Sequence, residues 1–121
     1  MSNDTYLAVF VGLQNNPRMA AWMALPEDER KAKEKAGIAA WKDWMVKHQD
    51  VIVGQEGGPL GKTKKVSASG IEDIRNNMGG FVVVRAPSHE EAAKYFLNHP
   101  HFTMFPGEAI EVMPVMPIPA G

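Results

Sequence analysis

The stretch GGFVVVRAPSHEEAAKYFLN, residues 79–98, decides the fold because it predicts a strand that leads directly into a capped helix. Residues 81–84 are β-branched or aromatic, a composition that favours a strand. Ser88 is followed three residues later by Glu91, and this capping box predicts a helix that starts at Ser88. Apolar side chains then recur on one helical face, and Pro100 predicts the end of the helix just before it.

The same reasoning, applied outward from this stretch, predicts the other elements. Apolar residues on both faces predict a first strand at 4–13, and Asn16 followed by Pro17 predicts a helix N-terminus. A second, longer helix is expected at 27–48, where apolar residues recur at helical spacing. The rest of the chain predicts a short strand at 51–53, a second at 63–68 that pairs with it as a hairpin, a loop or helical turn at 71–78, a loop at 99–107 and a last strand at 108–115.

Length and composition limit the possible classes of protein. The chain has 121 residues, so we expect a single domain at 1–121 with an extended tail at 115–121. The net charge is −1 and no basic block indicates nucleic-acid binding, while the absence of cysteine excludes disulfides and thiolate chemistry. No apolar run approaches the length of about 18 residues that a membrane span needs. The N-terminus also lacks the basic segment of a signal peptide, so we expect a cytoplasmic location without membrane contact.

The order of the predicted elements indicates the fold class. It is β, α, β(β), β, α, β, which is typical of the α+β ferredoxin-like βαββαβ sandwich, where helices cover one face of an antiparallel sheet. The predicted strands at 4–13 and 81–84 are apolar on both faces, and soluble monomers rarely expose a large apolar sheet face. We therefore expect a homodimer with sheet packed on sheet around a two-fold axis. The alternative is that the C-terminal tail or the Gly-rich hairpin folds back over the sheet.

Several motifs together resemble the YCII-related family, including its relatives with a DGPF-type motif. In chain order the motifs are LPEDER, WKDW, GQEGGPLGKTKKVSASG, GGFVVVRAPSHEEAAKYFLNHP and GEAIEVMPV, which extend from Leu25 to Val115. The resemblance implies a dimeric α/β-barrel protein of ferredoxin-like fold. Most members of that family have no established activity, and an active-site role for a His–Asp pair is suspected in some short members.

The chain departs from the family pattern at three places. Residues 12–25 contain no histidine, whereas the short members carry one shortly after the first strand. The DGPF-like stretch is SASGIED here, and Met113 stands where an arginine is often found. The His–Asp pair of the family therefore cannot be carried over to this chain.

Two histidines, His99 and His101, are the first candidates for catalysis. They flank Pro100 in a loop rich in aromatic residues, and either one can titrate near neutral pH and act as a general acid or base. The structural alternative is that one caps the preceding helix at Asn98 and the other is exposed. The pair is a poor metal site because no third or fourth ligand is evident.

Glu111 and three aromatic residues complete the candidate site. If its face of the last strand is buried, Glu111 becomes a candidate base, and otherwise we expect it to pair with Arg85 or a lysine at the sheet edge. Trp22, Phe102 and Phe105 are candidates for ligand binding, whereas Trp41 and Trp44 fit a core position.

Two hypotheses of function follow from these residues. The first is a small dimeric protein that binds or transforms a small organic acid or ring compound in a pocket between sheet and helices, without a cofactor or metal, and with His99 or His101 as the polar contact. The second is a non-catalytic interaction module whose dimer face is the functional surface. Nucleotide binding is disfavoured, because GQEGGPLGKTKK lacks the spacing of a phosphate-binding loop and does not open a helix.

Overall fold

The computed structural model describes residues 4–12 and 16–119 and contains six strands and four helices in that part of the chain. In chain order they are β1 (Asp4–Val11), α1 (Pro17–Met23), α2 (Glu27–Lys47), β2 (Ile52–Pro59), β3 (Thr63–Ser67), β4 (Gly70–Ile74), β5 (Met78–Ala86), α3 (His89–Lys94), α4 (Pro100–Thr103) and β6 (Ala109–Pro114). None of the helices among these residues is long and apolar enough to cross a membrane.

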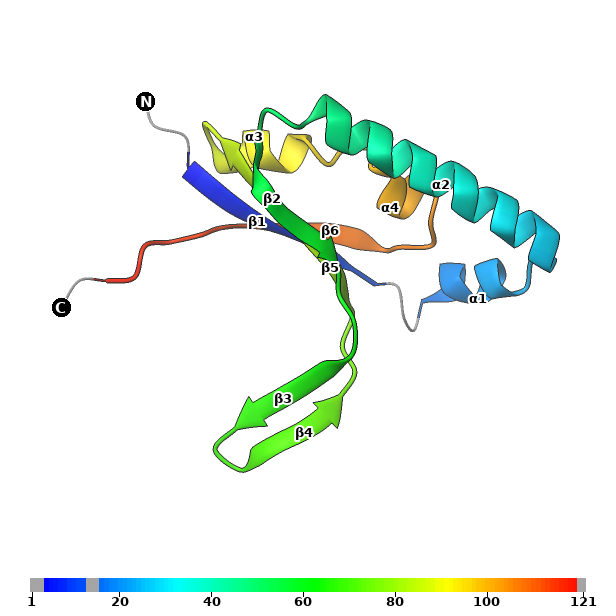
Figure 1. Ribbon diagram of the computed structural model, residues 1–121, viewed down its shortest axis with the longest axis horizontal. Helices are drawn as coiled ribbons and strands as arrows, with labels where there is room; N and C mark the ends of the chain where they lie inside the picture. Colours follow the sequence, from blue (N-terminus) through cyan, green and yellow to red (C-terminus); the bar gives the residue numbers. More distant parts are fainter. Residues whose placement is uncertain (1–3, 13–15, 120–121) are drawn as a thin grey trace.

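Four of the strands form one antiparallel sheet in the order β2-β5-β1-β6. Figure 1 shows α2, α3 and α4 together on one side of this sheet. An antiparallel sheet of this order, with both main helices on the same face, is the ferredoxin-like arrangement. The predicted fold class is therefore confirmed, with β3 and β4 added as a separate two-stranded hairpin between β2 and β5.

The core lies between the inner face of the sheet and the helices. Strand alternation places Tyr6, Ala8 and Phe10 of β1 on this inner face, and all three are buried. Trp44 of α2 and Phe96, which follows α3, pack against them in the same cluster. One stripe of each helix thus closes the core, and this fixes α2 over the sheet.

Both helix starts that the sequence predicts are present. The side chain of Asn16 accepts a hydrogen bond from the Met19 N–H at 2.9 Å, with Pro17 in the first turn of α1. The Ser88 hydroxyl accepts a hydrogen bond from the Glu91 N–H at 3.1 Å at the start of α3. These caps satisfy backbone N–H groups that a helix N-terminus cannot satisfy by itself.

The predictions of local structure for three segments are wrong. The strand at 51–53 does not form a hairpin with 63–68: β2 continues to Pro59 and pairs with β5, whereas β3 pairs with β4, in the segment where we expected a loop or helical turn. The predicted loop at 99–107 contains the short helix α4. Asn98 lies between α3 and α4, and its φ of 60° allows the chain to change direction before α4 begins.

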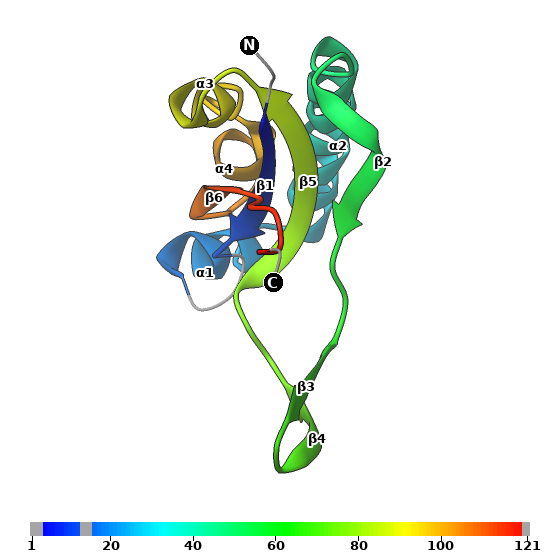
Figure 2. The same ribbon diagram turned by 90° about the vertical axis from the view of Figure 1, so that its left-hand side faces the viewer.

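The outer face of the sheet is only partly covered within a single chain, although Val9 on this face is buried. Leu7 and Val83 lie opposite each other in the centre of this face, and Met113 on the neighbouring strand is 39 % exposed. Figure 2 shows the β3–β4 hairpin projecting away from the body, and in Figure 1 the C-terminal segment continues beyond the start of β1. In the described chain, neither segment folds back over the sheet.

Candidate functional site

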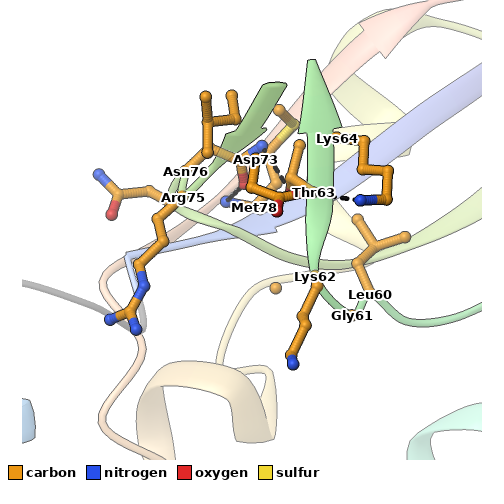
Figure 3. A pocket seen from close by; sticks show the side chains of 12 residues that line it. Leu60, Gly61, Lys62, Thr63, Lys64, Asp73, Arg75, Asn76 and Met78 are labelled. Atoms are coloured by element: carbon orange, nitrogen blue, oxygen red, sulfur yellow. Dashed lines mark hydrogen bonds and ion pairs between the residues drawn. The ribbon is translucent and has the colours of Figure 1, made fainter. Parts of the chain in front are cut away.

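Two hollows among the described residues are candidates for a site, and the larger of these two is at the base of the β3–β4 hairpin. It has a volume of about 1010 Å³ and is bordered by residues 60–64 and 73–79. Figure 3 shows the side chains of Lys62 and Arg75 extending separately, without a common centre. The Lys64 amine is paired with Asp73 at 2.7 Å on the exposed surface of the hairpin. Because its basic side chains do not converge on one point, we do not regard this hollow as the site.

The second hollow, here called the α2 cavity, lies between α2 and the β2–β5 side of the sheet. Its volume is about 610 Å³, within the usual range for small-molecule sites. The lining is mostly apolar and comes from five parts of the chain: Phe10; Ile38, Trp41, Lys42 and Met45; Gly57, Gly58 and Pro59; Gly79, Gly80, Phe81 and Val82; and His101 and Phe105. The structure therefore provides a pocket between sheet and helices, where the sequence analysis expected one.

His101 brings a titratable ring to this cavity. It is 1 % exposed, and its Nε2 atom lies 2.9 Å from the Val11 carbonyl oxygen. Because a carbonyl can only accept, Nε2 carries the proton and Nδ1 is the unprotonated nitrogen of the neutral ring. Gly107 leaves the space for this ring, since a Cβ at that position would lie 2.3 Å from its Cε1 atom.

Burial lowers the pKa of His101 below its usual value, because the charged form loses its hydration. Backbone hydrogen bonds with Val11 and Ala109 oppose this shift, while the Arg18 guanidinium adds to it. The ring is therefore neutral at pH 7 and is suited to accept a proton or a hydrogen bond.

His99 lies beside His101 in the core and is completely buried. Its Nδ1 atom accepts a hydrogen bond from the His101 backbone N–H at 2.9 Å and so caps α4. The ring proton is then on Nε2, which has no hydrogen-bond partner among the described residues. The ring centroids of Trp41 and Trp44 are 4.6 and 4.7 Å away, so this N–H group is surrounded by aromatic rings.

Desolvation lowers the pKa of His99 to about 3, with smaller contributions in the same direction from His101 and His48. The structural alternative for the pair is therefore wrong, because neither histidine is exposed and His99 caps the start of α4 rather than the end of the preceding helix. His101 lines the α2 cavity, and His99 supports it from behind.

Arg18 fixes the segment that carries the histidines. Its guanidinium donates hydrogen bonds to the carbonyl oxygens of Gly107 at 2.7 Å, Phe102 at 2.5 Å and Phe105 at 3.4 Å. The side chain of Asn16 also donates to the Pro106 carbonyl at 3.0 Å. The start of α1 thus holds the 102–107 segment in place beside the cavity.

The other predicted site residues divide into those near the cavity and those away from it. Phe105 lines it and packs so closely on α2 that a Cβ at Gly37 would lie 2.7 Å from its ring. Trp22 packs on Phe105 with ring centroids 5.8 Å apart and supports the cavity indirectly, while Phe102 contributes its carbonyl to Arg18. Glu111 is exposed and opposite Val9 on the outer face, so it does not join the histidines.

Sequence analysis missed part of the cavity. Trp41 packs against the core, as expected, but it also lines the α2 cavity, together with Ile38 and Met45 from the same apolar stripe. Four glycines of β2 and β5 also line the cavity: Gly57, Gly58, Gly79 and Gly80. The sequence does not predict this role, because a pair of adjacent glycines is more typical of a turn. No group of three histidine, aspartate or glutamate side chains within the described residues is placed to hold a metal ion.

Gly107→Ala is expected to destabilise the protein by about 1–3 kcal/mol, because the new methyl group collides with the buried His101 ring. Gly61→Ala is the matched control, since a Cβ there meets nothing within 4 Å, and its effect should stay within about 0.5 kcal/mol. Urea denaturation at pH 7 measures both. Equal stability of the two variants would contradict the tight packing around His101.

Comparisons with known proteins support the fold and leave the function open. No family model and no curated protein sequence matches the chain. Among solved structures, the chain is similar to 5-chloro-2-hydroxyhydroquinone dehydrochlorinase (TftG) from Burkholderia phenoliruptrix AC1100, solved in complex with 2,5-dihydroxybenzoquinone. The TM-score is 0.50 and the identity 17 %, over 89 % of each chain. The resemblance to the YCII-related family stays a prediction from its motifs, and the structural similarity shows that the two proteins share a fold.

Proposed function

We propose that this protein binds a small organic molecule in the α2 cavity and acts as a homodimer. The observation that carries the first part is the cavity itself. It is apolar, lies between a helix and a sheet, and has one buried titratable ring, His101, in its lining. Small-molecule sites have this composition, in which apolar walls supply affinity and a few polar groups fix orientation.

If the bound molecule reacts, His101 is the group suited to proton transfer. Its ring is oriented by the Val11 carbonyl and by the space at Gly107, and its neutral form is the one that can accept a proton. The His99 ring does not line the cavity, so its role is to cap α4 and hold His101. Of the two histidines, His101 is therefore the candidate for catalysis.

The similar fold of the dehydrochlorinase supports the proposal at the level of ligand class. That protein was solved with a small ring compound bound. A ring of this kind fits the size and the aromatic lining of the α2 cavity. The reaction and the substrate of this chain do not follow from the comparison.

The second part of the proposal concerns the outer face of the sheet. Leu7, Val83 and Met113 lie on this face, and no described segment of the same chain covers them. A second copy packed through the same face buries them and leaves the α2 cavity, on the opposite face, accessible. If the protein were only a non-catalytic interaction module, this face would be its functional surface. The α2 cavity would then have no function.

Ile38→Trp is expected to weaken binding of an aromatic probe by about tenfold or more, because the larger side chain fills the mouth of the cavity. Ile38 lines the cavity but is 51 % exposed, so the change should shift the melting temperature by no more than about 3 °C. Isothermal titration calorimetry with the neutral probe 2-naphthamide measures the affinity.

Val46→Trp is the control for this experiment. Val46 is on the same helix and is 64 % exposed, but it does not line the cavity. The Val46→Trp variant should therefore bind 2-naphthamide with the same affinity as the unmodified protein. No binding to the unmodified protein, or equal binding to Ile38→Trp, would count against the α2 cavity as a ligand site.

A further inference from the structure

The walls of the α2 cavity favour a flat ligand. One wall is aromatic and consists of Phe10, Trp41 and Phe105. The sheet part of the lining, which also carries Phe10, contains Gly57 and Gly58, whose φ values of 143° and 156° are ones that side-chain-bearing residues rarely adopt. These glycines expose backbone without side chains, so a planar ring can lie flat against peptide groups next to the aromatic rings.

Lys42 is the one cationic side chain in the lining. It follows Trp41 on α2 and is exposed, so its amine lies at the rim of the cavity rather than inside. None of the ion pairs among the described residues uses it. None of the described side chains in the lining is a carboxylate, so none of them opposes the attraction of an anion to Lys42.

The other nearby basic groups are already engaged or uncharged. Arg18 donates to three carbonyl oxygens of the 102–107 segment, and this geometry holds its guanidinium away from other partners. His101 is buried and donates to Val11, so it offers the ligand a neutral ring. Recognition of a negative group therefore depends on Lys42.

We propose that the α2 cavity takes a planar aromatic carboxylate, with its ring against the aromatic side chains and the glycine backbone and its carboxylate at the rim beside Lys42. This inference rests on the proposed function and specifies its ligand class. A carboxylate at the rim keeps part of its hydration, so it does not pay the cost of full burial. The volume of about 610 Å³ is sufficient for a two-ring molecule.

The experiment compares two probes of nearly the same shape, one anionic and one neutral. Isothermal titration calorimetry at low salt should show that 2-naphthoate binds about fivefold more tightly than 2-naphthamide, the gain expected for a partly exposed ion pair. Lys42→Met should remove this difference and leave the affinity for 2-naphthamide unchanged. Raising the salt concentration should reduce the preference for 2-naphthoate in the unmodified protein.

Lys33→Met is the matched control, because it removes the same charge from α2. Lys33 precedes Lys42 by nine residues, which places it on the opposite side of the helix, and it does not line the cavity. This variant should keep the preference for 2-naphthoate. Equal affinity for both probes, or an equal loss in both variants, overturns the carboxylate assignment and leaves the proposed cavity standing. Binding of neither probe overturns the proposed function itself.

Discussion

Leu7→Lys is expected to convert a dimer into a monomer, with the dissociation constant raised about 100-fold or more. Leu7 lies opposite Val83 in the centre of the outer sheet face, so in the proposed dimer its side chain is inside the interface. Burial of a lysine charge without a partner costs several times the thermal energy, and the cost arises in both copies because a two-fold interface uses the same residues twice. Sedimentation velocity at micromolar concentration measures the change.

The position of Leu7 makes this test specific. Its side chain points away from the core residues Tyr6 and Ala8, so the substitution leaves the inner face intact. Val66→Lys is the control, because Val66 lies on the projecting hairpin and is 75 % exposed. This control should remain dimeric. A monomeric unmodified protein, or a dimeric Leu7→Lys variant, would refute the sheet-packed dimer.

Local signals in the sequence predicted the parts of the fold that depend on neighbouring residues. The capping box at Ser88 and the Asn16–Pro17 pair each act within one helical turn, and both caps are present. The faces of β1 also follow from strand alternation, which places Tyr6, Ala8 and Phe10 in the core. In these cases the residues that decide the structure are adjacent in the sequence.

The errors concern pairings between residues that are far apart in the sequence. β2 passes through Gly54, with φ of 59°, and through two further glycines before it ends at Pro59, so its second half has the composition of a turn. Its partner is β5, and the ladder contains an irregularity between Ile52 and Gly57. No local pattern distinguishes this irregular edge strand from a hairpin, and the hairpin prediction failed for that reason.

The candidate site shows the same limit. Phe105 and His101 could be selected because aromatic residues and histidines together in a loop indicate a site. The cavity also needs Phe10, Trp41 and the glycine backbone, which the fold brings together from β1, α2, β2 and β5. The burial of both histidines depends on α4 and on the Arg18 contacts, and neither has a sequence signal strong enough to predict them.

The stability of the protein is expected to fall steeply in acid because of His99. Its pKa is about 3 in the folded protein and near the ordinary 6.5 in the unfolded chain, so the unfolded chain binds the proton more readily. The stabilisation from a neutral His99 is complete above pH 6.5 and is lost as the pH falls from there toward 3. Over this range the free energy of unfolding falls by about 1.4 kcal/mol per pH unit, and the total loss is about 5 kcal/mol.

The physical reason for this cost lies in the surroundings of the ring. His99 is completely buried among aromatic side chains, and its Nδ1 atom is committed to the His101 N–H group. A protonated ring would lose that hydrogen bond and would place a charge beside Trp41 and Trp44 without hydration. Burial also lowers the pKa of His101, so protonation of His101 destabilises the folded protein in acid as well. A loss of this size is comparable with the whole stability of many small domains.

His99→Asn tests this assignment. The Asn oxygen can accept the His101 N–H hydrogen bond but cannot take up a proton in this range, so stability should change much less between pH 6.5 and 4. The variant should be less stable at pH 7 because the ring no longer fills the space beside Trp44. His89→Asn is the control: His89 is exposed, so that variant should keep the full acid slope. Urea denaturation at pH 7, 6, 5 and 4 measures the slopes, and an unchanged slope in His99→Asn would show that other groups govern acid unfolding.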